Sequence, residues 1–94
     1  MEVPKRDGWV YILKPVGHNV YKVGCTTDLA RREKTMGKAY GFDIEYVAFN
    51  YYSDYEGAER WWHEHFKKRN KYLIGEWFLL TSEDIHYFIM EGTS

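Results

Sequence analysis

The amino-acid sequence predicts an α+β fold, a small three-stranded antiparallel sheet flanked by helices. Two short aromatic segments are separated by turn residues, and a third segment alternates apolar and polar residues. Helix-capping signals occur in the stretches that follow the second and third segments. With 94 residues the chain can bury one hydrophobic core, so we expect a single domain over residues 1–94.

The first two strands are predicted at residues 9–13 and 20–24. The sequence Pro-Val-Gly-His-Asn at residues 15–19 has the composition of a turn, so the strands should form an antiparallel hairpin. Side chains alternate between the faces of a strand. We therefore expect Tyr11 on the same face as Trp9 and Leu13, and Lys22 on the same face as Gly24.

The next two elements are a helix and a third strand. Residues 26–28, Thr-Thr-Asp, are typical N-cap residues, and the helix that follows them should run to about Met36, with Gly37 as its stop. Polar and apolar residues alternate well enough over residues 43–49 to predict the third strand.

Two further helices are predicted in the second half of the chain. Ser53 and Glu56 have the spacing of a capping box and open a helix whose apolar positions are Ala58, Trp61, Trp62, His65 and Phe66. Residues 71–80 should form a loop with a short strand or extended segment. Residues 81–84 then cap a last helix that continues through Ile85, Phe88 and Ile89.

Composition excludes several classes of protein. The single cysteine, Cys25, rules out an internal disulfide and a cysteine-rich zinc site, and it suits a reducing compartment. No stretch has the length of a membrane span, and residues 1–7 lack the apolar region of a secretory signal. We therefore expect a soluble, intracellular, unprocessed protein that does not associate with membranes.

The net charge of −1 provides no global field for a polyanion. Nucleic-acid binding would need a local patch, and the candidates are Lys67, Lys68, Arg69 and Lys71. These cations lie near the end of a predicted helix, so an equally good interpretation is that they only complement the helix dipole.

An ordered series of motifs runs from Trp9 to Phe78. It comprises Val10-Tyr11 after Trp9, Lys22-Val23-Gly24, Thr26, Arg32 eight residues beyond the glycine, Ala58-Glu59 on a helix, and Glu76-Trp77-Phe78. This series resembles the GIY-YIG nuclease superfamily. It is most similar to a branch common in phages and other viruses, in which the second motif reads Lys-Ile-Gly and Glu-Trp-Phe follows the glutamate helix.

Helical periodicity bears on the two charged motif residues. Arg32 falls on the same side of its helix as Leu29, whereas Arg31 points away, so Arg32 should turn toward the fold. The Arg32 guanidinium would then bind a phosphate, or it would form an ion pair with the carboxylate of Glu59 or Glu33.

Glu59 falls within a stripe of aromatic residues on the second helix, where a carboxylate needs a cation or a metal. A lone glutamate there would favour a salt bridge. The surrounding family pattern favours a ligand of Mg²⁺ or Mn²⁺, and Mg²⁺ needs only one or two protein carboxylates.

The sequence departs from the superfamily pattern at three positions. Lys22 occupies the place of a second tyrosine, and Tyr21 should face away from it. Physically, an ammonium near Tyr11 would lower the pKa of its phenol. Met36 lies where many members have a histidine, and the late asparagine of many members corresponds here either to Glu76 or to no residue. Glu76 is a candidate accessory residue, and so is His63, which lies one helical turn beyond Glu59 and would brace it or join the site.

The resemblance implies a metal-dependent endonuclease acting on DNA. Tyr11, assisted by Lys22, would accept a proton from the attacking water, Arg32 would neutralise the phosphorane, and an ion held by Glu59 would stabilise the departing 3′ oxygen. Specificity would come from a homodimer or a partner. The alternatives are an inactive module that binds nucleic acid or protein, and a structural protein in which Arg32 and Glu59 simply pair.

Overall fold

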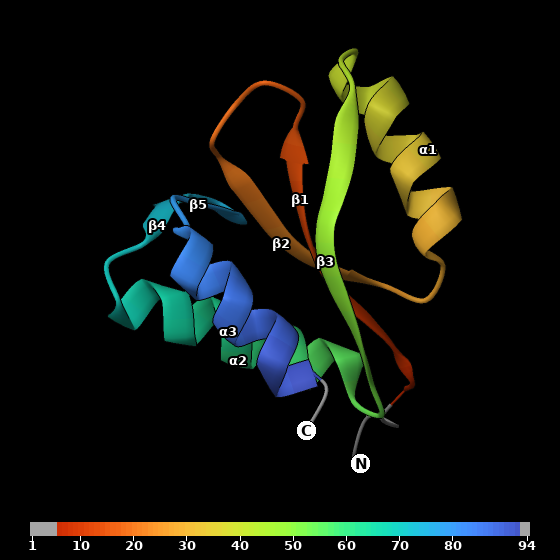
Figure 1. Ribbon diagram of the computed structural model, residues 1–94. Coiled ribbons are helices and arrows are strands. Elements are labelled where there is room, and N and C mark those ends of the chain that lie inside the picture. Colours follow the sequence, from red (N-terminus) through yellow and green to blue (C-terminus); the bar gives the residue numbers. More distant parts are fainter. Residues whose placement is uncertain (1–5, 93–94) are drawn as a thin grey trace.

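The computed structural model describes residues 6–92 (Figure 1). It contains five strands and three helices in the order β1 (Gly8–Pro15), β2 (Tyr21–Thr26), α1 (Leu29–Tyr40), β3 (Ile44–Tyr52), α2 (Tyr55–Lys68), β4 (Tyr72–Ile74), β5 (Trp77–Phe78) and α3 (Ser82–Gly92). The predicted α+β class is confirmed. None of the helices in this part of the chain is long and apolar enough to cross a membrane.

The sheet is open and antiparallel, with strand order β3-β1-β2-β5-β4. The predicted hairpin forms, and Tyr11 of β1 pairs with Gly24 of β2. The expectation of three strands was too low by two, because β4 and β5 have only three and two residues. Strands this short offer too few alternations for sequence periodicity to identify them.

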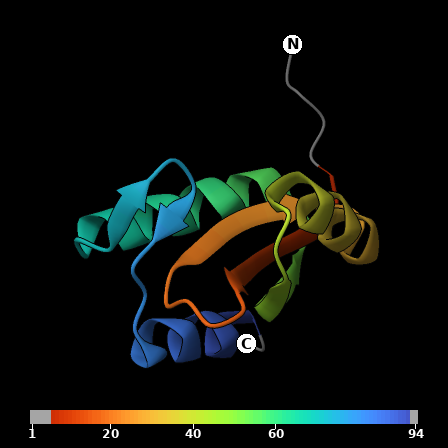
Figure 2. The same ribbon diagram turned by 90° about the horizontal axis from the view of Figure 1, so that it is seen from above.

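Helices cover both faces of the sheet (Figures 1 and 2). Helices α2 and α3 lie alongside each other under one face, where Trp62, Phe66 and Phe88 pack on Val10, Ile12 and Val23. Helix α1 lies on the other face, where Met36 packs on Tyr11 and Leu13. The predicted alternation along β1 and β2 is therefore confirmed.

The helix ends differ from the predicted ones. Helix α1 continues past Gly37 and ends at Gly41, which has a left-handed φ of 70° and donates its N–H to the Gly37 carbonyl. Of these two glycines only Gly41 has a positive φ, the conformation that glycine adopts without strain, whereas Gly37 lies inside the helix. At α2 the N-cap is Asp54 rather than Ser53, and its carboxylate accepts from the Gly57 N–H.

Helix α2 also buries fewer of its predicted apolar positions than expected. Trp62 and Phe66 are 2% and 0% exposed, but Trp61 is 51% exposed and stacks on His65. The buried face of α2 is therefore narrower than the predicted stripe.

Candidate active site

Tyr11 lies on β1, which has β3 on one side and β2 on the other in the sheet. Its side chain is on the face that α1 covers, and 1% of its surface is exposed. Its hydroxyl donates to Met36 Sδ at 3.6 Å. The ring lies directly over Gly24, where an added Cβ would be 2.4 Å from the hydroxyl oxygen. The glycine of the second motif is thus required because the phenol approaches the β2 backbone too closely for any side chain.

The electrostatic environment keeps Tyr11 neutral. Burial raises the pKa of its phenol well above the ordinary value of 10.0, the Arg32 guanidinium pulls it down in part, and the Glu76 carboxylate raises it further. The expectation that Lys22 would lower this pKa is wrong, since the net shift is upward. At neutral pH the hydroxyl is therefore a hydrogen-bond donor and acceptor rather than a phenolate.

Lys22 and Glu76 form an ion pair through Nζ and Oε2, next to the point where Trp77 of β5 pairs with β2. The lysine side chain is 11% exposed and the glutamate 43%. Glu76 thus carries a negative charge that raises the Tyr11 pKa, and Lys22 is its ion-pair partner. The structure thus places the accessory residue Glu76 directly beside two of the predicted catalytic side chains.

Arg32 is exposed rather than turned into the fold. Its charge still lowers the pKa of both Tyr11 and Tyr46, so the guanidinium lies close to the phenols on this face. Among residues 6–92, the ion pairs join other residues, and none links Arg32 to Glu59 or Glu33. The structural pairing considered as an alternative is therefore absent from the part of the chain described.

The short length of β5 opens the edge of β2. Only Tyr21 and Lys22 have partners in β5. Val23 still donates its N–H to the Glu76 carbonyl, and its own carbonyl accepts a bond of 2.6 Å from His63 Nε2 on α2. Because a carbonyl only accepts, His63 carries its proton on Nε2. Beyond the end of β5, His63 therefore replaces a strand as the hydrogen-bond partner of β2, and α2 lies against this edge.

Glu59 lies one turn before His63 on α2 and reaches the same edge. Its carboxylate accepts from the Cys25 thiol, whose pKa rises to about 12 through burial, this hydrogen bond and the charges of Glu59, Glu56 and Glu76. Cys25 is therefore an unreactive thiol at neutral pH. Several carboxylates thus lie near this edge, and among residues 6–92 none of the ion pairs includes Glu59.

The donor set at this edge fits a hydrated Mg²⁺ ion. Glu59 is half-buried on the helix and has no ion pair among residues 6–92. Within the same residues no three His, Cys, Asp or Glu side chains are grouped to hold a metal. A Mg²⁺ ion held by one carboxylate, with water and phosphate oxygens as its other ligands, does not need such a group.

These positions lie within a match to a known family. The family model described as the T5orf172 domain matches residues 8–91, which includes every strand and nearly all of the last helix. The chain belongs to the T5orf172 domain family. No curated protein and no solved structure matches it.

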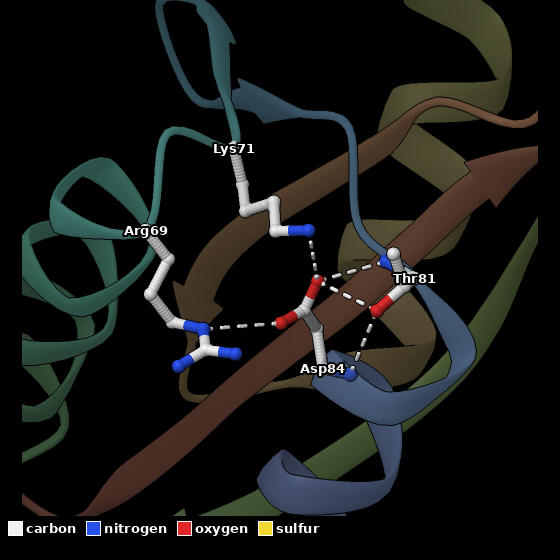
Figure 3. Close-up of polar contacts among 4 residues, drawn as sticks. All are labelled: Arg69, Lys71, Thr81 and Asp84. Atoms are coloured by element: carbon white, nitrogen blue, oxygen red, sulfur yellow. Dashed lines mark hydrogen bonds and ion pairs between the residues drawn. The ribbon is translucent and has the colours of Figure 1, made fainter.

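The predicted basic patch of this T5orf172 domain lies at the far end of α2 (Figure 3). Arg69 and Lys71 each approach the Asp84 carboxylate at 3.5 Å, and Asp84 is 2% exposed. Lys67 lies over the Tyr72 ring at 4.8 Å, whereas Lys68 is exposed. Three of the four cations thus have partners within the fold.

In the T5orf172 domain the cap of the last helix was predicted at residues 81–84 and is confirmed, whereas one contact of Cys25 was missed. Asp84 closes a capping box with Thr81, accepting from its N–H and hydroxyl while the hydroxyl accepts from the Asp84 N–H. The spacing of Thr81 and Asp84 carried this signal. No sequence pattern indicates the contact between Cys25 and Glu59.

Proposed function

We propose that this T5orf172 domain is a metal-dependent endonuclease that hydrolyses DNA phosphodiester bonds. The family is associated with nuclease-like domains, which supports a nuclease or DNA-binding role. The observation that carries the proposal is a set of neighbours around β2: the charges of Arg32 and Glu76 act on Tyr11, and those of Glu59 and Glu76 act on Cys25.

Tyr11 and Glu76 would together remove the proton from the attacking water. Because burial keeps the phenol neutral, Tyr11 is suited to orient the attacking water through its hydroxyl. The Glu76 carboxylate, held by Lys22, is close enough to act on the same phenol and is the base to which the proton can pass, directly or through Tyr11. Lys22 would then position Glu76 rather than activate Tyr11.

Arg32 and Glu59 would act on the phosphate. The Arg32 guanidinium is exposed and has no carboxylate partner in the described chain, so its planar donors are available for two phosphate oxygens. Glu59 would hold Mg²⁺ or Mn²⁺, and the bound ion supplies electrostatic stabilisation of the departing 3′ oxygen.

The test is nicking of supercoiled plasmid with Mg²⁺ or Mn²⁺. We expect the parent protein to nick and Glu59→Gln to lose at least about a hundredfold of the rate. Glu64→Gln, the same change at an exposed position of α2, should keep full activity. Equal nicking by the parent and Glu59→Gln preparations would show contamination and refute the proposal.

A second candidate, a binding module without catalysis, is favoured by one observation. The raised pKa of Tyr11 keeps its phenol protonated, so Tyr11 by itself does not serve as the base of a hydrolysis. Such a module would shift DNA in a gel but leave plasmid intact with either metal. For both candidates we propose that a homodimer or a partner supplies sequence specificity, since the net charge of −1 favours weak binding by the domain alone.

A further inference from the structure

Aromatic rings form a continuous series from the buried Tyr11 to the surface of the sheet. Tyr11 contacts Tyr46 at 5.4 Å between ring centroids, Tyr46 contacts Phe49 at 5.9 Å, and Phe49 contacts Trp9 at 5.6 Å. Trp9 contacts Tyr51 at 5.0 Å. Every one of these pairs is steeply inclined, so the rings brace one another edge to face.

The outer end of this series is uncovered. Helix α1 packs at Ile44 and Tyr46, near the start of β3, and the end of the strand extends beyond it (Figure 1). Phe49 and Tyr51 are 48% and 55% exposed although they lie on a strand of the central sheet. Rings held in fixed orientations on adjacent strands and open to solvent make a stacking platform, defined here as Trp9, Phe49 and Tyr51.

Positive charge adjoins the stacking platform. Helix α1, on the same face of the sheet, carries four exposed basic side chains against the single acidic Glu33, and these are Arg31, Arg32, Lys34 and Lys38. A cleft of about 360 Å³ lies between its first turns and the end of β2, lined in part by Thr26, Arg31 and Arg32. The chain as a whole has no such excess of positive charge.

We propose that the stacking platform binds unpaired bases of a DNA strand whose backbone lies along α1 and leads to the candidate active site. This inference rests on the proposed function and names its substrate class, DNA with a single-stranded segment. Duplex DNA hides the faces of its bases, whereas an unpaired strand offers them to aromatic rings, and each stacked base contributes substantially to affinity without sequence preference. Arg32 links the two sites, since its charge acts on Tyr11 and on Tyr46.

The experiment measures binding by fluorescence anisotropy of a labelled mixed-sequence oligonucleotide, single-stranded or annealed to its complement. EDTA is present, so that cleavage plays no part. Tyr51→Ala removes one ring of the platform. Tyr87→Ala is the matched control, because Tyr87 is also a tyrosine with 40% exposure but lies on α3, against the opposite face.

We expect the parent protein to bind the single strand more tightly than the duplex, and Tyr51→Ala to weaken single-strand binding at least about fivefold. Tyr87→Ala should bind as the parent does. Tyr51→Leu, which keeps an apolar side chain but removes the ring, should resemble Tyr51→Ala and shows that stacking rather than folding is lost.

Equal affinity for the two DNA forms, or unchanged single-strand binding by Tyr51→Ala, would overturn the inference even if the protein cleaves plasmid. Loss of concentration-dependent self-association in Tyr51→Ala, with DNA binding intact, would identify the platform as a contact between copies and overturn it too. Failure of the parent to nick plasmid would refute only the nuclease proposal, because these binding measurements do not depend on cleavage.

Discussion

Gly24 is the residue at which the fold and the candidate active site constrain each other most tightly. A methyl group added there would lie 2.4 Å from the Tyr11 hydroxyl oxygen and 2.6 Å from Cζ. Ordinary contacts begin at 3.4 Å, so the ring and the β2 backbone must separate by about 1 Å. Tyr11 cannot simply swing away, since it is 1% exposed and is enclosed by Met36 and Tyr46.

The expected cost of Gly24→Ala follows from two opposing effects. Overpacking a buried site costs about 1–3 kcal/mol, and replacing glycine by alanine stabilises by about 0.4–1 kcal/mol through the unfolded chain. We therefore expect a net loss of about 1–2 kcal/mol in the free energy of unfolding. In a domain of this size that lowers Tm by roughly 5–15 °C, and displacement of the Tyr11 hydroxyl should reduce plasmid nicking as well.

Urea denaturation of the variant and of Gly37→Ala tests this estimate. Gly37 is inside α1 and an added Cβ there meets no atom within 4 Å, so the same chemical change should stabilise by about 0.5–1 kcal/mol. The two substitutions should thus move the midpoint in opposite directions. If Gly24→Ala were as stable as the parent, the close approach of Tyr11 to β2 would not exist in solution and the geometry of the candidate site would fail with it.

Three other outcomes are expected. Burial opposes ionisation of Asp84, but the Thr81 hydrogen bonds and the Lys71 charge outweigh it and lower its pKa. Asp84→Asn should therefore destabilise at pH 7 in urea melts, and the difference from the parent should shrink as the pH falls through the lowered pKa of Asp84. With a pKa of about 12 against 9.0, Cys25 should react with iodoacetamide about a thousandfold more slowly at pH 8 than in the urea-unfolded chain. Mg²⁺ should accelerate that reaction by neutralising Glu59, and an equal acceleration in Glu59→Gln would place the ion elsewhere.

The longer elements of the fold could be predicted from local pattern. The hairpin has turn residues between two alternating segments, and the last helix has its capping residues directly before the apolar positions. The end of α1 could not be predicted reliably, because Gly37 and Gly41 are both plausible stops and only the tertiary position of Tyr40 against Trp77 favours the later one. The pair β4 and β5 depends on long-range pairing with β2, which has no local signature.

The candidate site was predictable as a set of residues but not as a set of interactions. The ordered motifs predicted roles for Tyr11, Arg32 and Glu59 because sequence order and spacing are what a motif records, and these roles stay predictions. The partner of Lys22 was not predictable, since Glu76 is 54 residues away and reaches it only through β5. For the same reason the sign of the Tyr11 pKa shift was wrong: burial and the nearness of the Glu76 charge are properties of packing, not of spacing.

Strand β5 has only two residues, and this affects which side chains can reach the candidate site. Tyr11 and Glu59 project from opposite sides of the sheet, Tyr11 toward α1 and Glu59 from α2, and a longer β5 would continue to pair with β2 and separate them. His63 instead satisfies the Val23 carbonyl at 2.6 Å, so the strand edge is closed by a side chain and not by backbone. In the proposed nuclease, the short β5 would let groups from both faces approach one phosphate at this edge.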